Sequence, residues 1–232
     1  MRRAAVTVEA FEVPAADLPA VRGFLHRPAA PVADAIVLTH GAGSDCRAPL
    51  LVDLADGLAA AGRLVLRCDL PFRQARPHGP PSPAGAERDR MGLRHAAQAV
   101  RGMVSGRLIL SGLSYGGRQA SVLAAEEPAL ADALVLLAYP LHPPARPGEW
   151  RTEHFSRLRT PTLFVHGTHD PFGSLEELER ARSLIPARTE LLVVRGSHDL
   201  GYSCSAPAEG DLPGRVCDAL DALVRGAASR PA

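Results

Sequence analysis

The sequence has little that would suit a membrane or a nucleic-acid partner. Its 26 basic and 25 acidic side chains nearly cancel, which leaves a net charge of +1. A nucleic-acid-binding surface needs a basic excess, so that class of partner is not predicted. No apolar run approaches the roughly 20 residues of a membrane span. Glu9 and Glu12 interrupt the N-terminal segment, so we expect no signal peptide and a cytoplasmic protein.

Cysteine is also scarce. The four cysteines, Cys46, Cys68, Cys204 and Cys217, show no C-x-x-C spacing, so neither a zinc site nor a disulfide framework is predicted. We expect reduced, structural thiols, with Cys46 at the surface. The sequence predicts no metal and no cofactor, and it leaves the oligomeric state open.

What remains is an ordinary globular composition. Hydrophobic residues make up 46% of the chain and charged residues 22%, which argues against disorder. The length of 232 residues suits one sizeable core, and the chain contains no internal repeat and no long linker. We therefore expect a single domain over residues 1–232.

Strand and helix patterns alternate along the chain. Short apolar runs predict strands at Val6–Val13, Val21–His26, Ala35–Thr39, Leu64–Cys68, Arg107–Ser111, Ala133–Ala138, Thr162–His166 and Glu190–Val194. Helical spacing predicts helices at 49–61, 86–105, 115–127, 175–185 and 216–223. The first two strands suit an antiparallel hairpin at a sheet edge, whereas strands separated by helices pair in parallel. The predicted fold class is therefore α/β, with a mostly parallel central sheet covered by helices on both faces.

Three local features add to this outline. Ser174 and Glu177 form a capping box at the start of the helix that follows them. The proline-rich segment 71–83 predicts a long loop, and structureless runs of that length are usually functional. The tail, residues 226–232, is expected to fray.

A G-x-S-x-G motif directly follows one of the buried strands. Gly112-Leu113-Ser114-Tyr115-Gly116 comes after the apolar run Leu108–Leu110 and opens a predicted helix. In such a strand-to-helix turn, neighbouring backbone passes so close that glycine is needed two residues before and after the serine. The turn also directs the backbone N–H of Tyr115 at a developing oxyanion. The alternative for Ser114 is an ordinary serine at a helix N-cap.

A nucleophilic serine needs an imidazole base that is itself oriented by a carboxylate. Asp170 and His198 each follow a predicted strand at its C-terminal end, in the order Ser, Asp, His. Because open α/β sheets bind ligands at that edge, we expect the two side chains to meet Ser114 there.

Other residues compete for these roles. Asp199 and Asp211 are alternative acids, the first adjacent to the histidine and the second typical of a helix start. His142 is the main rival base, because it follows the strand next to the one that carries Ser114. We assign it instead to the substrate-binding wall.

The segment His40-Gly41-Ala42-Gly43-Ser44 follows an earlier strand. It resembles the H-G-x-G oxyanion loop of esterases, in which small residues let backbone N–H groups approach the reacting carbonyl. Ala42 is the expected second donor beside Tyr115, and Gly43 is the next candidate. An ordinary glycine turn is the alternative interpretation of the segment. A phosphate-binding loop and a dinucleotide fingerprint are excluded, since neither G-K-[ST] nor G-x-G-x-x-G is present there.

Taken together, His40–Ser44, Gly112–Gly117, Asp170 and His198 resemble a compact α/β-hydrolase of the dienelactone-hydrolase-like kind. The run Tyr139–Pro144 resembles a subfamily of small hydrolases related to a regulatory subunit of an animal histone-acetyltransferase complex. The resemblance implies an α/β-hydrolase fold with little or no lid. Dienelactone hydrolases proper carry a cysteine nucleophile where this chain has a serine, so lactone specificity is not carried over.

Two functions follow from these observations. The first is a serine hydrolase that cleaves a small ester, thioester or related acyl bond through an acyl-enzyme. The second is a non-catalytic binding or regulatory module on a hydrolase scaffold. The segment 139–160 offers little apolar surface to cover a long acyl chain, so a shallow, partly open site for short acyl groups is expected.

Overall fold

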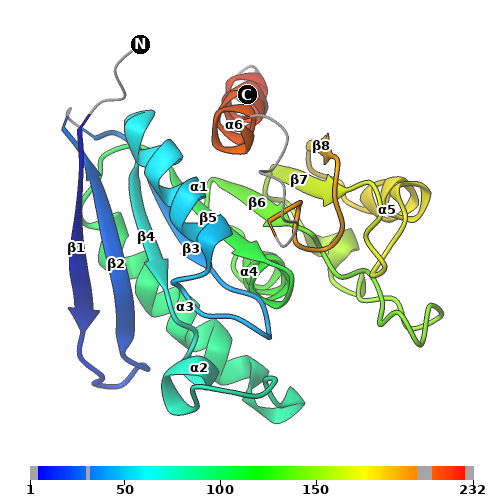
Figure 1. Cartoon of the computed structure of the whole chain (residues 1–232), viewed down its shortest axis with the longest axis horizontal. Helices are drawn as coiled ribbons and strands as arrows, with labels where there is room; N and C mark the ends of the chain where they lie inside the picture. The colour runs from blue at the N-terminus through cyan, green and yellow to red at the C-terminus, as the bar shows by residue number, and fades with distance from the viewer. Residues whose placement is uncertain (1–4, 30–31, 203–210, 228–232) are drawn as a thin grey trace.

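A computed structural model describes residues 5–29, 32–202 and 211–227. Its core is one eight-stranded sheet with the order β1-β2-β4-β3-β5-β6-β7-β8 (Figure 1). The strands are β1 (Val6–Val13), β2 (Val21–Pro28), β3 (Ala35–Thr39), β4 (Leu64–Cys68), β5 (Leu108–Leu113), β6 (Ala133–Leu137), β7 (Thr162–Gly167) and β8 (Thr189–Val194). β1 pairs antiparallel with β2, and β2 pairs antiparallel with β4, whereas all further pairs are parallel. The predicted edge hairpin and mostly parallel sheet are confirmed.

Helices cover both faces of the sheet, as predicted. They are α1 (Pro49–Ala60), α2 (Pro71–Ala75), α3 (Ala86–Arg101), α4 (Tyr115–Glu126), α5 (Leu175–Arg182) and α6 (Leu212–Ala227), with 3-10 turns η1 (Pro83–Gly85) and η2 (Phe155–Arg157). The apolar faces of α1 and α6 join one hydrophobic cluster, and those of α3, α4 and α5 join the other. Figure 1 shows α1 and α6 on the same side of the sheet.

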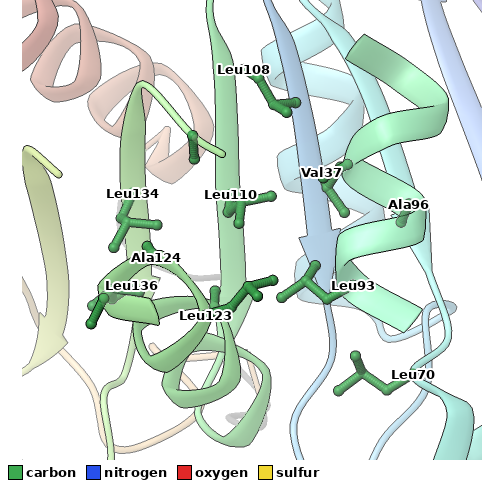
Figure 2. Packing of buried hydrophobic residues seen from close by; sticks show 14 of the residues in the cluster. Val37, Leu70, Leu93, Ala96, Leu108, Leu110, Leu123, Ala124, Leu134 and Leu136 are labelled. Atoms are coloured by element: carbon green, nitrogen blue, oxygen red, sulfur yellow. The ribbon is translucent and has the colours of Figure 1, made fainter. Parts of the chain in front are cut away.

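The central strands are buried on both faces because their residues alternate between the two clusters. In β3, Ile36 and Leu38 belong to the α1–α6 side, while Val37 belongs to the α3–α4 side. Figure 2 shows Leu93 on α3 and Leu123 on α4 meeting the leucines that the central strands present to that face. Full burial of each such side chain contributes about 1.5–3 kcal/mol. The packing holds the strand ends, and therefore the loops that follow them, in fixed positions.

The proline-rich segment differs from its prediction. Residues 71–75 form the short helix α2, with Pro71 in its first turn and the N–H of Phe72 bonded to the Asp89 carboxylate at 2.9 Å. Five residues are too few to show a helical period, so only Pro71, which suits a first helical position, signals this helix. Cys46 also departs from its expected surface position, since it is fully buried.

The capping box and the helix ends can also be compared with their predictions. The predicted capping box is present, with the Ser174 N–H bonded to Glu177 at 2.8 Å and the Glu177 N–H bonded to the Ser174 hydroxyl at 3.2 Å. α3 ends at Arg101, four residues earlier than expected. In the expected tail, α6 continues through Ala227, and 228–232 lie outside the described residues. No helix within the described ranges has the length and apolar character needed to cross a membrane.

Candidate active site

Four strands carry the candidate site at one edge of the sheet. β3 leads into His40–Ser44, β5 leads into Ser114, β7 leads into Asp170, and β8 leads into His198. These strands run parallel, so their C-terminal ends, and the loops after them, face the same edge. Residues far apart in the sequence therefore meet there.

Ser114 occupies a tight turn between β5 and α4. Its backbone has φ 50° and ψ −110°, a conformation that L-residues rarely adopt. A Cβ on Gly112 would lie 2.4 Å from the backbone of Gly116, and one on Gly116 would lie 2.5 Å from Thr39 Oγ1. Both distances are far below van der Waals contact, so glycine is required at the two flanking positions, as the motif predicted.

A continuous hydrogen-bonded chain joins the three predicted side chains. His198 Nε2 lies 2.8 Å from Ser114 Oγ, and His198 Nδ1 lies 2.8 Å from Asp170 Oδ2 and 3.0 Å from Oδ1. The carboxylate can only accept, so Nδ1–H donates to it, and Nε2 is left to accept from the Ser114 hydroxyl. This tautomer is the one in which imidazole can take a proton from serine.

The structure also shows what holds Asp170 and His198 in place. The Asp170 side chain is fully buried, and its Oδ1 accepts the backbone N–H of Phe172 at 2.9 Å. The Phe172 ring lies against the imidazole, with centroids 4.1 Å apart and planes inclined by 30°. Phe172 therefore fixes both the carboxylate and the plane of His198. No pattern in the sequence distinguished this residue.

The alternative acids have backbone partners of their own. Asp199 accepts the N–H of Gly201 at 3.0 Å, and Asp211 accepts the N–H of Gly214 at 3.1 Å near the start of α6. Neither carboxylate is bonded to the His198 ring.

His142 is the one predicted site residue that the structure places neither on the cavity wall nor in the hydrogen-bonded chain from Ser114 to Asp170. It is not among the described residues that line the cavity, and it is only 5% exposed. Its Nε2 lies 3.3 Å from Glu177, and its ring lies 6.4 Å from that of Trp150. The expected place at the rim of the site is therefore wrong. The chain after β6 turns toward α5, so its proximity to the nucleophile strand does not carry His142 to Ser114.

The predicted oxyanion loop lies directly beside Ser114. A Cβ on Gly41 would lie 3.6 Å from Ser114 Cβ, which is ordinary contact distance. His40 accepts the N–H of Leu70 at Nε2 (3.1 Å), so its Nδ1–H donates to the Gly41 carbonyl at 2.8 Å. Burial lowers the pKa of His40, which keeps the ring neutral in this role. In a trans peptide the carbonyl and the next N–H point in opposite directions, so His40 sets the direction of the Ala42 N–H.

Arg73 holds the same loop from α2. Its guanidinium donates to the carbonyls of Ala42 at 2.8 Å and Ser44 at 2.9 Å, and to that of Pro77 at 2.7 Å. The side chain is 7% exposed. By holding the Ala42 carbonyl, Arg73 sets the direction of the Gly43 N–H, the other candidate donor. Sequence reasoning missed Arg73, because an arginine in a proline-rich segment carries no signal of burial.

Both the backbone and the side chain of Tyr115 are held in place. Its backbone begins α4, where the first N–H groups have no partner within the helix. Its hydroxyl donates to the buried Asp89 carboxylate at 2.7 Å, and its ring meets Phe72 edge-on with centroids 5.6 Å apart. Burial, followed by the bond to Asp89, raises the pKa of the Tyr115 hydroxyl, so the ring stays neutral. The side chain thus fixes the helix end whose N–H is the predicted donor.

A cavity of about 990 Å³ opens at Ser114. It is lined by the predicted oxyanion loop, the segment 80–83, residues of α4, Phe172 and His198. The proline-rich segment therefore borders the site, as expected. The volume of the cavity falls at the upper end of the range for small-molecule sites. The cavity is therefore larger than the shallow site expected from the sequence. Across the described residues, no three histidine, cysteine or acidic side chains gather as they would to hold a metal ion.

Comparisons with known proteins agree with this architecture. A family model described as an alpha/beta hydrolase domain matches residues 32–211. Among solved structures, the chain is similar to a dienelactone hydrolase from Anabaena variabilis (20% identity, TM-score 0.71), with 95% of this chain and 98% of that one covered.

Two further structures show the same likeness. One is an α/β serine hydrolase without lid from Xanthomonas campestris (18% identity, 97% of each chain covered, TM-score 0.67). The other is a cold-adapted esterase from an Arctic intertidal metagenomic library (17% identity, 96% of each chain covered, TM-score 0.69). At these identities the likeness shows the fold.

Proposed function

The chain belongs to the alpha/beta hydrolase domain family, and on that basis we propose that it is a serine hydrolase. Its substrate would be a small ester, thioester or related acyl compound. Ser114 would be the nucleophile, His198 the general base and acid, and Asp170 the residue that orients His198. The observation that carries the proposal is the hydrogen-bonded chain from Asp170 through His198 to Ser114.

The reaction would proceed in two halves. Ser114 Oγ attacks the acyl carbon while its proton passes to His198 Nε2, and the carbonyl oxygen becomes an oxyanion facing the N–H groups of Ala42 and Tyr115. The tetrahedral intermediate collapses, the bond to the leaving alcohol or thiol breaks, and His198 returns the proton to that leaving group. Water, deprotonated by His198, then attacks the acyl carbon of the acyl-enzyme. The bond to Ser114 Oγ breaks, His198 returns the proton to that oxygen, and the acid is released.

The backbone at Ser114 supports catalysis over a purely structural role. Holding a residue in such a strained conformation costs on the order of 1–3 kcal/mol, which a plain helix cap does not require. The strain places Oγ within 2.8 Å of His198 Nε2. A binding module would not require the serine hydroxyl and the imidazole to lie within hydrogen-bond distance.

The segment between β6 and β7 supports a preference for short acyl groups. Phe155 and Leu158, two of its few apolar residues, are fully buried in the α3–α4 cluster and cannot wall an acyl chain. The only regular element in this segment is the short turn η2. We expect kcat/KM for p-nitrophenyl esters to be highest for acetate or butyrate. A steady rise toward palmitate would contradict the expected short-chain preference.

A fluorophosphonate probe tests the proposed function. Such probes are attacked readily only by a hydroxyl that has a base and an oxyanion hole. We expect labelling of the folded protein, peptide mapping to Ser114, and loss of the label in Ser114→Ala. Ser82→Ala is the matched control, since Ser82 lines the same cavity without a base and should leave the label intact. Folded protein that resists labelling would favour a binding module.

A further inference from the structure

The fixed charges on the cavity wall are mostly positive. Three arginines line the cavity, Arg90, Arg118 and Arg151, against one acidic side chain, Asp199. Arg90 already has partners, with Glu126 at 3.2 Å and the Gln119 side chain at 3.2 Å. For Arg118 and Arg151, by contrast, no carboxylate of the described residues comes within 4.0 Å. Two arginines thus line the cavity without an ion-pair partner within 4.0 Å among the described residues.

Arg118 lies one helical turn from Ser114. Its backbone N–H bonds to the Ser114 carbonyl at 2.9 Å, and both residues line the cavity from the same face of α4. Long side chains on a helix lean toward its N-terminus, which here is the end that carries Ser114. Arg118 Nε is buried and has no hydrogen-bond acceptor among the described residues. Buried donors without an acceptor are uncommon, and a bound ligand is one remedy.

Arg151 lines the same cavity from the segment after β6, and its charge interacts with that of Arg118. Its backbone is held on both sides, because its N–H bonds to the Leu141 carbonyl at 2.7 Å and its carbonyl accepts the Tyr139 hydroxyl at 2.6 Å. Burial lowers the pKa of Arg151, and the nearby Arg118 guanidinium lowers it further. Glu149 acts on Arg151 in the opposite sense, but its carboxylate is bonded to Arg146 at 2.8 Å.

We propose that Arg118 and Arg151 form a subsite for an anionic group of the substrate, a carboxylate or a phosphate, beside Ser114. The proposal rests on the proposed hydrolase function and names its substrate class: short esters or thioesters that also carry such an anion. Guanidinium groups match both anions with paired N–H donors, and an anion between them relieves their mutual repulsion. The Ser114 and Arg118 backbones are separated by about 6 Å along the helix axis. We therefore expect a short spacer, of two to four carbons, between the anion and the reacting carbonyl.

Matched pairs of ethyl esters test this subsite. Monoethyl succinate and ethyl butanoate, or monoethyl glutarate and ethyl pentanoate, differ in a carboxylate that replaces a methyl group. Ethyl 3-phosphonopropanoate distinguishes a phosphate-type from a carboxylate preference. Turnover is followed by proton release at constant pH. We expect kcat/KM to favour the anionic member at least ten-fold, because hydrogen bonds to charged groups discriminate by roughly ten- to a hundred-fold.

Variants locate the effect. In Arg118→Gln and in Arg151→Gln, the ratio of kcat/KM for the anionic ester to that for its neutral partner should fall by about ten-fold or more. Arg157→Gln is the control, since Arg157 is exposed in η2 and is not among the described residues that line the cavity. It should keep the wild-type ratio. Fluorophosphonate labelling of each variant shows that its site has formed.

The outcomes separate the subsite from the function. If the wild-type protein is labelled but hydrolyses both members of a pair equally well, the proposed subsite is wrong and the proposed hydrolase function still holds. This comparison uses wild-type protein alone, so it does not depend on whether the variants fold. Binding without turnover is measured by calorimetry of monoethyl glutarate with Ser114→Ala, and we expect the added Arg118→Gln change to weaken it at least ten-fold. Unchanged binding would contradict the subsite, whereas absent labelling and absent hydrolysis would contradict the proposed function itself.

Discussion

The two halves of the candidate site are built differently. Ser114, Asp170 and His198 stand at the ends of parallel strands and bond to one another. The oxyanion loop, although it also follows a strand, depends on side chains from elsewhere that hold its carbonyls: His40 holds Gly41, and Arg73 holds Ala42 and Ser44. The first half is fixed by the sheet, whereas the second is fixed by individual hydrogen bonds.

That difference predicts different sensitivities. Loss of a side chain at the strand ends removes a chemical group and leaves the framework standing. Loss of a side chain that holds the predicted oxyanion loop leaves every proposed reacting group present. It frees the peptides that we propose to stabilise the oxyanion. Both should lower kcat, the first by far more than the second.

The largest effect is expected in the first half. His198→Ala and Asp170→Asn should lower kcat on a short ester by roughly four orders of magnitude, because the serine loses its base or the base loses its tautomer. His142→Gln is the matched control, and steady-state kinetics with p-nitrophenyl acetate is the measurement. If His142→Gln abolished turnover and His198→Ala retained it, the base would have been assigned to the wrong histidine.

A smaller effect is expected from Arg73. Arg73→Met should lower kcat about a hundred-fold with little change in KM, the size expected when one oxyanion donor is lost. Arg73→Lys should fall between wild type and Arg73→Met, because an ammonium can hold only part of the same set of carbonyls. The side chain of the exposed Arg76 bonds to the Pro80 carbonyl and to no other group in the described part of the chain, so Arg76→Gln is a control. A loss that appeared in KM alone would show that Arg73 does not act on the oxyanion loop.

The remaining prediction concerns stability in acid and not catalysis. Burial, followed by the nearby charges of Arg118 and Arg157, lowers the pKa of His154 to about 4. The unfolded chain, with an ordinary histidine near pH 6.5, binds the proton first, so stability is fully present above that pH and is lost as pH falls toward 4. This loss amounts to about 3 kcal/mol. Urea unfolding from pH 7 to 4 measures it, and His154→Gln, which keeps a polar partner for Ser121, should flatten the profile. An unchanged profile would contradict this origin.

The positions of Ser114, Asp170 and His198 at the strand ends could be predicted from the sequence for a physical reason. Each buried strand is a short apolar run, and Ser114, Asp170 and His198 lie within a few residues of where such runs end. Parallel pairing then brings those ends together without any further information. The fold and the meeting of these three side chains could therefore be predicted, while their catalytic roles remain a prediction.

The other features depend on contacts that no local pattern encodes. Arg73 reaches the oxyanion loop across about 30 positions of the chain, and Phe172 stacks on a histidine 26 positions later. His142 was misplaced for the same reason, because the direction of the chain after β6 depends on packing against Phe172 and α5. Sequence periodicity reports which face of an element is buried, but not which side chain a loop will meet.

Trapping the acyl-enzyme would show whether Ser114 is the nucleophile. The protein is mixed with excess p-nitrophenyl acetate, quenched in acid within the first turnovers, and examined by intact mass and peptide mapping. We expect one added acetyl group per chain at Ser114, and none in Ser114→Ala. In Asp170→Asn the acetyl group should accumulate further if deacylation slows more than acylation. Turnover in Ser114→Ala at the wild-type rate, or an acetyl group carried by another residue during turnover, would contradict the role of Ser114 as nucleophile.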